Sequence, residues 1–237
     1  RCEGEFGGAY VGAGAGLSTR GARDVHVVYS RVHCVGATAV CPVLERTGFE
    51  QVEVYGPHAE PDGDFPNVPG HVSNPENAAV FDAIADYARQ QGADLAIASD
   101  PDCDRIGCSA PREFAENAEW ATLTGNQIGA LLAVYVLESR RGQGGLTPEH
   151  YVVETLVTTQ LTRRIADSYG VKTFGNLLVG FKWIAGVIDE QGPKLFLYGT
   201  EESHGYLAGT HARDKDGGAA ALLLCELAAK LKSEDET

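Results

Sequence analysis

In the first half of the chain, short apolar runs are separated by segments whose apolar residues recur with helical spacing. The apolar runs predict strands at 25–30, 52–55, 93–98 and 106–110. Helices are predicted between them, over about 37–47 and from 74 to 92, where Asn74 can cap and Pro75 suits the first helical position. Strands that alternate with helices indicate a largely parallel sheet covered by helices.

The same pattern starts again after the polar stretch 111–120, which is typical of a linker. The second half predicts strands at 151–156, 171–174 and 194–198 and helices at 124–140, 158–169, 181–190 and 218–232. The sequence therefore predicts the α/β class, with two similar units, each a mixed, largely parallel sheet covered by helices. We place these units at 1–111 and 112–237.

The opening segment Gly7–Gly16 is rich in glycine but fits neither a phosphate-binding loop nor a dinucleotide fingerprint. We expect a mobile segment or the edge of a cut chain. The chain contains no methionine, not even at its start, which predicts that it is a piece of something longer.

The six residues Asp100–Arg105 follow the predicted strand 93–98 and form the segment with the clearest chemistry. Three carboxylates at alternate positions repel one another unless a cation lies among them. Oxygen ligands on a short loop suit Mg²⁺, and an arginine adds a fixed planar cation. We therefore predict that Asp100, Asp102 and Asp104 bind Mg²⁺ and that Arg105 lies beside the ion. Such a site suits an oxyanion, above all a phosphoryl group.

Three other interpretations of this loop compete with a magnesium site. A calcium-binding EF-hand loop requires Gly at its sixth position and Glu at its twelfth, where this chain has Arg105 and Pro111. That mismatch argues against calcium. A solvated acidic turn and a phosphatase with an Asp nucleophile remain open as alternatives.

The charge of the chain limits its partners. It has 33 acidic and 19 basic residues, with a formal net charge of −14. This field argues against nucleic acid or an anionic membrane as partner, and an anionic substrate must be held by local Arg and Lys groups and a metal. No signal peptide and no apolar run long enough for a membrane span are found, which predicts a cytoplasmic protein. The six cysteines have no C-x-x-C spacing and are expected to be free thiols: Cys2, Cys34, Cys41, Cys103, Cys108 and Cys225.

A second polar segment, Gly199–Gly205, follows the predicted strand 194–198. It carries two carboxylates and a hydroxyl, which suit the hydroxyl groups of a sugar, although a solvated turn has the same composition. The candidate residues of this segment are Glu201, Glu202, Ser203 and His204.

Three further cations are candidates for anion binding. Lys182 is placed at a predicted helix start, where free backbone N–H groups also attract an anion. Arg213 and Lys215 lie in a turn with two aspartates. Taken alone, Lys182 also fits an ordinary surface lysine, and the turn also fits a solvated, self-paired one.

Five segments together resemble the α-D-phosphohexomutases, the phosphoglucomutase/phosphomannomutase superfamily. In chain order they are DPDCDR (100–105), TGNQIGALL (124–132), VGFKWI (179–184), GTEESHGY (199–206) and RDKDG (213–217). The resemblance covers essentially the whole chain. His33–Gly36 is similar to the H-G-V-G loop of this superfamily, with Cys34 in place of the first glycine. With EESxGY, that loop favours the branch that includes eukaryotic-type phosphoglucomutase and phosphopentomutase.

The resemblance implies a role for each candidate residue. The three aspartates of the acidic loop would hold Mg²⁺, and Arg105 would orient a phosphoserine or the substrate phosphoryl group. Glu201 and Ser203 would bind sugar hydroxyls, with Glu202 and His204 in the same loop. Lys182 would lie close to the transferring group, and Arg213 and Lys215 would support phosphate or sugar binding. The implied reaction moves a phosphoryl group between the C1 and C6 oxygens of a hexose phosphate, or C5 in pentoses, through a bisphosphorylated sugar.

One departure from the superfamily limits this interpretation. Its enzymes have four domains, and this chain resembles only the second and third. The T-x-S-H-N-P loop that carries the phosphoserine is absent, since Val72–Pro75 has only its last letters. We therefore expect the chain alone to be inactive and its partners to be a phosphorylated sugar and the flanking domains of a longer parent. A non-catalytic sugar-phosphate or Mg²⁺-binding module is the alternative, and glucose, mannose and pentose substrates are not ranked.

Overall fold

The computed structural model describes residues 4–19, 21–113, 115 and 118–236 and divides into two compact units. Unit 1 combines Arg1–Leu123 with Gly217–Thr237, and unit 2 is Thr124–Asp216. Each unit is an α/β structure with its own sheet, so the predicted fold class is confirmed.

Unit 1 is built on a five-stranded sheet, sheet A. Its strands are β1 (Val27–Ser30), β2 (Val52–Val54), β3 (Leu95–Ser99), β4 (Ile106–Pro111) and β5 (Trp120–Thr122). The spatial order is β2-β1-β3-β4-β5, in which β1 runs parallel to β2 and β3, while β4 and β5 are antiparallel to their neighbours. Because Ser30 pairs with Ala98, the carboxyl ends of β1 and β3 lie at the same edge of the sheet.

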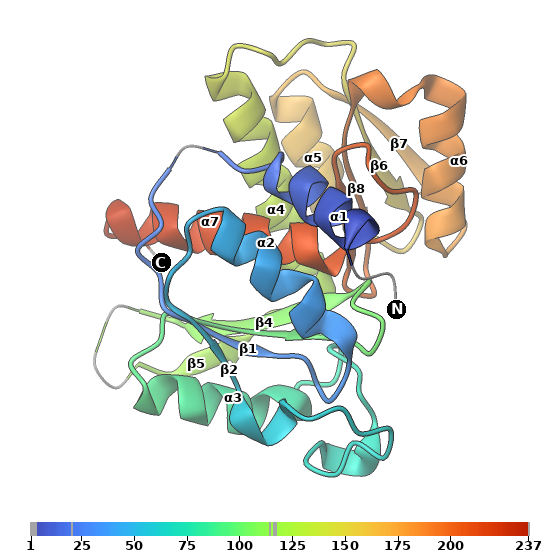
Figure 1. Cartoon of the computed structure of the whole chain (residues 1–237). Coiled ribbons are helices and arrows are strands. Elements are labelled where there is room, and N and C mark those ends of the chain that lie inside the picture. The colour runs from blue at the N-terminus through green and yellow to red at the C-terminus, as the bar shows by residue number, and fades with distance from the viewer. Residues whose placement is uncertain (1–3, 20, 114, 116–117, 237) are drawn as a thin grey trace. The chain divides into compact units, whose positions relative to one another are not determined.

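Helices cover both faces of sheet A (Figure 1). One face is covered by α3 (Ala79–Gln90), whose apolar side packs with Val28, Ala96 and Ala98 of the sheet. On the opposite face, α7 (Gly217–Ser233) contacts β3 and β4, α2 (Val40–Arg46) lies along α7, and α1 (Glu5–Ala15) contacts both of these helices. Burial of apolar side chains on the two faces is the main source of stability for such a layered unit.

Helix α1 corrects one prediction. The glycine-rich opening was expected to be a mobile segment or a cut edge, but Glu5–Ala15 is helical. Gly14 is buried there, and a Cβ atom on it would lie 3.2 Å from Cγ2 of Val43 on α2. The lack of a side chain therefore allows two helix backbones to approach closely. Packing against α2 and α7 offsets the low intrinsic helix propensity of glycine.

The start of α3 was also predicted wrongly. Residues 75, 76 and 78 lie in turns that replace the first helical turn, and the helix begins at Ala79. The side-chain oxygen of Asn74 accepts from the backbone N–H of Glu76, and that of Asn77 accepts from the N–H of Ala79. The side chains of Asn74 and Asn77 thus accept from nearby backbone N–H groups, which favours turns here and a later start of the helix.

Unit 2 is built on a four-stranded sheet, sheet B, in the order β7-β6-β8-β9. Its strands are β6 (Tyr151–Thr155), β7 (Lys172–Leu177), β8 (Phe196–Glu201) and β9 (Gly205–Ala208). The first three are parallel and β9 is antiparallel to β8. Strand β9 was not predicted, because its residues lie in and directly after the segment interpreted as a polar loop.

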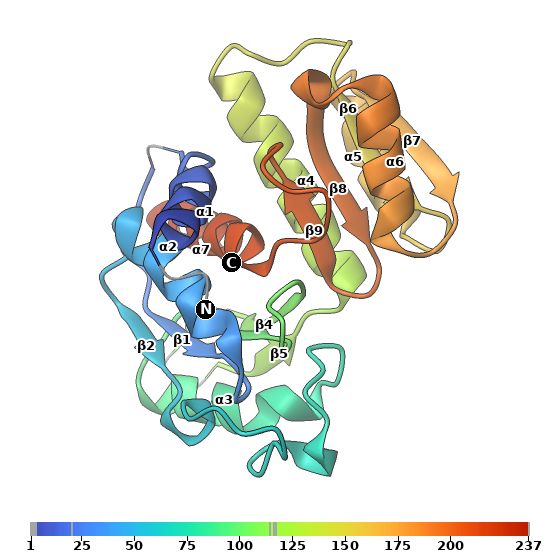
Figure 2. The same ribbon diagram turned by 45° about the vertical axis from the view of Figure 1, so that its right-hand side comes forward.

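The helices of unit 2 lie on opposite sides of sheet B (Figure 2). On one side, α4 (Gly125–Gly142) contacts β8 and α5 (Gln160–Ser168) contacts β6 and β7, while α6 (Phe181–Gln191) packs on the other. The predicted cap at Thr124 is confirmed, since Thr124 and Gln127 form a reciprocal capping box at the start of α4.

The compact units differ from the predicted division at 111/112 in two places. Strand β5 pairs with β4 of sheet A, and α7 packs against unit 1 although it is last in the sequence. Buried Glu226 of α7 fixes this return, because it accepts from Ser18 Oγ at 2.7 Å, from the backbone N–H of Thr19 at 2.9 Å and from Arg23 at 2.7 Å.

Across the described residues, no helix combines the length and the apolar character that crossing a membrane requires. Five of the six cysteines fall in the described part of the chain, and all five are free thiols, as predicted: Cys34, Cys41, Cys103, Cys108 and Cys225. The sixth, Cys2, lies outside the described residues.

Candidate functional site

The acidic loop, Asp100–Arg105, is the tip of a β-hairpin between β3 and β4. Ser99 pairs with Ile106, so the six loop residues close the hairpin directly after the last ladder pair. The backbone N–H of Asp100 donates to the carbonyl of Arg105 over 3.2 Å, and the N–H of Cys103 donates to the carbonyl of Asp100 over 3.1 Å. These two backbone hydrogen bonds fold the loop back on itself.

The three predicted ligands are brought together in this loop. One carboxylate oxygen from each of Asp100, Asp102 and Asp104 lies within 4.8 Å of the others. Asp100 is buried, with 2% of its surface exposed, and its Oδ1 accepts from the backbone N–H groups of Asp104 at 3.1 Å and Arg105 at 3.0 Å. Asp102 is exposed. The trio is therefore anchored at one end and open to solvent at the other.

Arg105 is held against this trio by two acids. Its Nε donates to Oδ2 of Asp100 at 2.9 Å, and its Nη1 donates to Glu76 at 3.1 Å. Burial raises the pKa of Asp100 to about 6, and Asp104 adds to that rise, against the opposing hydrogen bonds from Arg105. Sequence reasoning missed Glu76, because an acid in the turn before a helix carries no signal that an arginine some thirty positions later will pair with it.

This donor set fits the predicted Mg²⁺. The ligand atoms are all carboxylate oxygens, which hard cations prefer, and the exposed side at Asp102 leaves room for the waters that Mg²⁺ keeps. The raised pKa of Asp100 indicates that negative charge is unfavourable there without a further cation. Asp100, Asp102 and Asp104 are the residues that would hold the ion.

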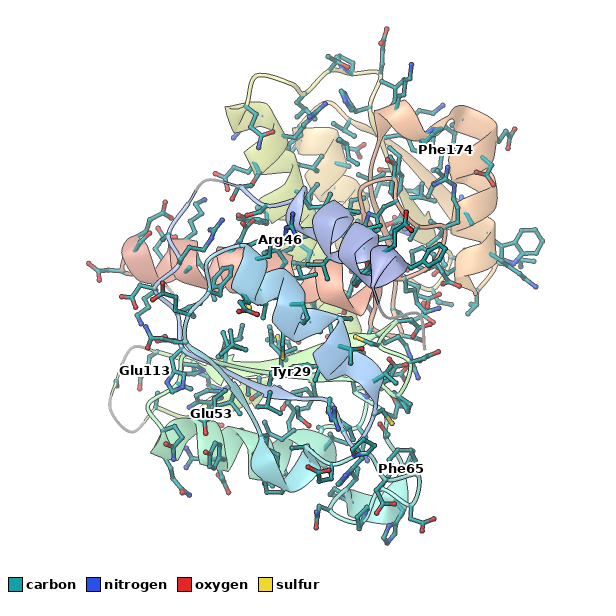
Figure 3. The ribbon with its side chains drawn as sticks, in the orientation of Figure 1. Tyr29, Arg46, Glu53, Phe65, Glu113 and Phe174 are labelled. Atoms are coloured by element: carbon teal, nitrogen blue, oxygen red, sulfur yellow. The ribbon has the colours of Figure 1, made fainter. Side chains whose placement is uncertain are left out.

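The loop after β1 supports the acidic loop from the neighbouring strand. The backbone N–H of Val35 donates to the carbonyl of Pro101 at 3.4 Å. Tyr29, labelled in Figure 3, reaches from β1 to Ser99 at the end of β3, with 2.8 Å between their hydroxyl oxygens. Gly36 lies against both hydroxyl groups, and a Cβ atom there would overlap them. The H-C-V-G segment therefore packs directly on the base of the acidic loop.

In unit 2, the predicted sugar-binding segment forms the end of β8 and its turn into β9. Glu201 is the last residue of β8 and is 6% exposed. Its Oε1 lies 3.9 Å from Nζ of Lys215, and that ammonium also lies 3.0 Å from Asp214. Gly205 provides the space for this pair, because a Cβ on it would meet the side chains of both Glu201 and Lys215. Glu201 and Lys215 are thus brought together.

The turn itself is held by Glu202. One of its carboxylate oxygens accepts from Thr155 Oγ1 at 3.2 Å and the other accepts from Ser203 Oγ at 3.2 Å. His204 is buried, with a positive φ of 62°. Gly125, the first residue of α4, packs against this turn so closely that a side chain would overlap the carbonyl of Glu202. The four candidate residues therefore share one rigidly packed turn.

Lys182 and Arg213 differ in their surroundings. Lys182 lies exposed in the first turn of α6, with its ammonium 5.5 Å from the centre of the Trp183 ring. Arg213 is engaged by α6, where its Nε donates to Asp189 at 2.7 Å. Lys215 also approaches the start of this helix, since its Nζ lies 5.5 Å from the centre of the Phe181 ring. The start of α6 thus has cations nearby that could meet an anion.

Comparison with known proteins identifies the family. Residues 9–113 match phosphoglucomutase/phosphomannomutase, alpha/beta/alpha domain II, and residues 124–236 match alpha/beta/alpha domain III of the same family. A phosphoglucomutase of Staphylococcus epidermidis is 35% identical over 212 residues, which is 89% of this chain and 37% of that protein. A Haemophilus influenzae protein named "Probable phosphomannomutase" is 32% identical over 230 residues, 97% of this chain and 44% of that protein.

A solved structure shows the same fold. The phosphoglucomutase/phosphomannomutase family protein from Burkholderia thailandensis matches with a TM-score of 0.69 at 18% identity, over 94% of this chain and 44% of that one. The chain therefore belongs to the phosphoglucomutase/phosphomannomutase family, and it comprises that family's domains II and III. It spans less than half the length of the two curated relatives named above.

Proposed function

We propose that this chain supplies the metal-binding and sugar-binding parts of a phosphosugar mutase. The reaction moves a phosphoryl group between the C1 and C6 oxygens of a hexose phosphate through a bisphosphorylated sugar. The observation that carries the proposal is the acidic loop, in which three carboxylates converge within 4.8 Å at a hairpin tip, an arrangement that suits an ion assisting phosphoryl transfer. The relatives include proteins named for glucose and for mannose substrates, and the proposal covers both.

Each candidate residue has a role in this proposal. Asp100, Asp102 and Asp104 hold Mg²⁺, which when bound neutralises charge on the phosphoryl oxygens. Arg105 keeps Asp100 oriented through the 2.9 Å bond between Nε and Oδ2. In unit 2, Glu201 and Ser203 bind sugar hydroxyls, with Glu202 and His204 shaping their turn. Lys182, Arg213 and Lys215 supply positive charge for phosphate.

The phosphoryl donor is proposed to come from outside these residues. No T-x-S-H-N-P sequence occurs in the chain, so a phosphoserine of that kind has to be supplied by another domain of a longer parent. The 237 residues alone are accordingly proposed to bind ion and ligand without turnover.

Two measurements test this function. Titration calorimetry of the chain with Mg²⁺ should show one site that Asp102→Asn weakens by at least about tenfold, since a charged ligand is lost. The longest natural polypeptide that contains these residues should convert glucose 1-phosphate to glucose 6-phosphate only with Mg²⁺, and Asp102→Asn should lower that rate by orders of magnitude. Release of free phosphate instead of isomerised sugar would identify a phosphatase and overturn the mutase assignment.

A further inference from the structure

Arg31 is a cation at the carboxyl end of β1 whose guanidinium has no partner among the described residues. β1 ends at Ser30 and pairs in parallel with β3, whose last residue is followed by the acidic loop. Arg31 is therefore the first residue beyond the sheet edge, on the strand next to the proposed Mg²⁺ ligands. The carboxyl edge of a parallel sheet is where such folds bind ligands.

The partners of the two arginines near this edge differ. The guanidinium of Arg105 donates to the carboxylates of both Asp100 and Glu76. Arg31 forms no hydrogen bond or ion pair with its guanidinium within the part of the chain that the structure describes, and its Nε is buried without a partner. A buried N–H donor without a hydrogen-bond partner is unfavourable, so the Nε of Arg31 is the feature that calls for an explanation.

Other contacts place Arg31 close to the acidic loop. Four residues further on, the N–H of Val35 donates to the carbonyl of Pro101, which joins the two loops. The pKa of the Cys34 thiol is affected by charges from both loops. Burial raises this pKa, the charge of Arg31 lowers it, and the charges of Asp100 and Asp102 raise it. The charges of Arg31 and of two of the three aspartates therefore act on the same thiol.

The backbone here is held in an uncommon conformation. Val32 and His33 both have positive φ values, 44° and 64°, although neither is glycine and Val32 is β-branched. Such strain of roughly 1–3 kcal/mol per residue persists only where surrounding contacts impose it, and it is concentrated at functional sites. The turn directs the chain from the end of β1 toward the acidic loop, with Arg31 at its start.

We propose that Arg31 binds the phosphate group of a phosphate monoester beside the Mg²⁺ ligands. This inference rests on the proposed function, in which the three aspartates hold Mg²⁺. A guanidinium offers a planar fork of donors that matches phosphate oxygens, and the open side of the aspartate trio leaves the ion accessible to the same group. Arg105 then fixes the carboxylates while Arg31 contacts the ligand.

The test uses the 237-residue chain, Mn²⁺ as a paramagnetic substitute for Mg²⁺, and inorganic phosphate observed by ³¹P NMR. Mn²⁺ accepts the same oxygen ligands and broadens the signal of any phosphate bound next to it. With Mn²⁺ bound, Arg31→Gln should weaken phosphate binding about tenfold or more, the usual effect of losing a charge-assisted hydrogen bond. Mn²⁺ binding itself should be unchanged or tighter, because Arg31 is not a ligand and its removal deletes a nearby cation.

The matched control is Arg46→Gln, which makes the same change in net charge. Arg46 is exposed at the end of α2 in the same unit (Figure 3). It should leave phosphate affinity within about twofold of the wild type, since bulk charge is largely screened by salt. Equal phosphate affinity in the two variants, or no Mn²⁺-dependent broadening in the wild type, would overturn the proposal. If Arg31→Gln lowers thermal stability, a second variant, Arg31→Lys, keeps the charge but lacks the planar fork of donors. Arg31→Lys should lose phosphate affinity to an intermediate extent. Wild-type phosphate affinity in both variants, at a temperature where both are folded, would also overturn the proposal.

The outcomes separate this inference from the proposed function. If Mn²⁺ binds and Asp102→Asn abolishes its binding, while Arg31→Gln leaves phosphate unaffected, the metal site stands and Arg31 does not contact the ligand. If Mn²⁺ does not bind at all, the metal assignment fails. Competition with inorganic phosphate by glucose 1-phosphate and by O-phosphoserine then distinguishes a sugar phosphate from a phosphoserine as the natural ligand. The natural ligand should lose more affinity on Arg31→Gln than the other compound does.

Discussion

Arg105 and Asp100 stand at the two ends of the acidic loop and close it, with Nε of the arginine 2.9 Å from Oδ2 of the aspartate. The same aspartate accepts two backbone N–H groups through its other oxygen. Both carboxylate oxygens of Asp100 thus accept hydrogen bonds that hold the loop. This relationship couples the geometry of the three carboxylates to the stability of unit 1.

Arg105→Ala should destabilise the chain, because it leaves the Asp100 carboxylate, 3% exposed, without its cation. We expect a loss on the order of 3 kcal/mol in the free energy of unfolding, measured by urea denaturation. Arg112→Ala is the control, since Arg112 and Glu119 form a pair at 3.7 Å with both side chains mostly exposed. That variant should lose less than about 1 kcal/mol. Similar losses in the two variants would show that the Asp100 pair contributes no more than a surface contact.

Gly36→Ala should be unfavourable for a steric reason. The new methyl group would overlap the hydroxyl groups of Tyr29 and Ser99, which lie 2.8 Å apart beneath the acidic loop. We expect a cost of about 1 to 3 kcal/mol in urea denaturation, and weaker Mg²⁺ binding because Ser99 precedes Asp100.

Two variants check this explanation. Gly63→Ala introduces the same methyl group where no described residue lies within 4 Å of it, and it should leave stability nearly unchanged. Gly36→Ala combined with Tyr29→Phe should be less destabilised than the two single changes added together, because removal of the hydroxyl makes room. Strict additivity of the two single effects would contradict the proposed overlap.

Local patterns were enough to predict the main strands, most helices and the acidic loop. The aspartate trio and Arg105 are consecutive in the sequence, so their convergence follows from one turn after one strand. The resemblance to a known family rested on equally local motifs, and the family matches confirmed it.

Features that depend on distant contacts were not predictable in this way. The glycine-rich helix α1 packs against α2 and α7, and these tertiary contacts stabilise it. The return of α7 to unit 1 and the pairing of Glu76 with Arg105 join residues far apart in the chain. That the Nε of Arg31 has no hydrogen-bond partner among the described residues is likewise a property of the folded chain, since nothing in the sequence indicates which arginines find a partner.

Glu226→Gln should weaken the attachment of α7 to the segment before β1. The buried carboxylate accepts from Ser18, Thr19 and Arg23, and its neutral replacement leaves Arg23 without a countercharge and places N–H groups opposite donors. We expect a loss on the order of 3 kcal/mol in the free energy of unfolding. Glu234→Gln, at an exposed pair with Lys230 near the end of the same helix, should change stability by less than about 0.5 kcal/mol. Equal effects of the two substitutions would mean that the buried hydrogen bonds of Glu226 contribute little to the free energy of unfolding.

Glu154 should make the stability of the chain depend on pH. It is 1% exposed on β6, its Oε1 accepts from Arg163 at 3.2 Å, and its buried Oε2 has no hydrogen-bond partner in the part of the chain that the structure describes. Burial raises its pKa above the ordinary value of 4.5, and the charge of Arg163 only partly opposes this. In the native state it therefore binds a proton at a higher pH than in the unfolded chain.

The sign of the effect follows from this order of protonation. As the pH falls through the raised native pKa toward 4.5, the native state binds more protons than the unfolded state, so the free energy of unfolding rises. Above the native pKa this contribution is lost. Glu154→Gln cannot titrate, so the stability of the wild type relative to this variant should increase on going from about pH 8 to pH 5, as measured by urea denaturation at each pH. Glu149→Gln, at an exposed position before β6, controls for the loss of one carboxylate. A wild-type advantage over Glu154→Gln that shrinks as the pH falls would mean that Arg163 outweighs burial and holds the glutamate ionised.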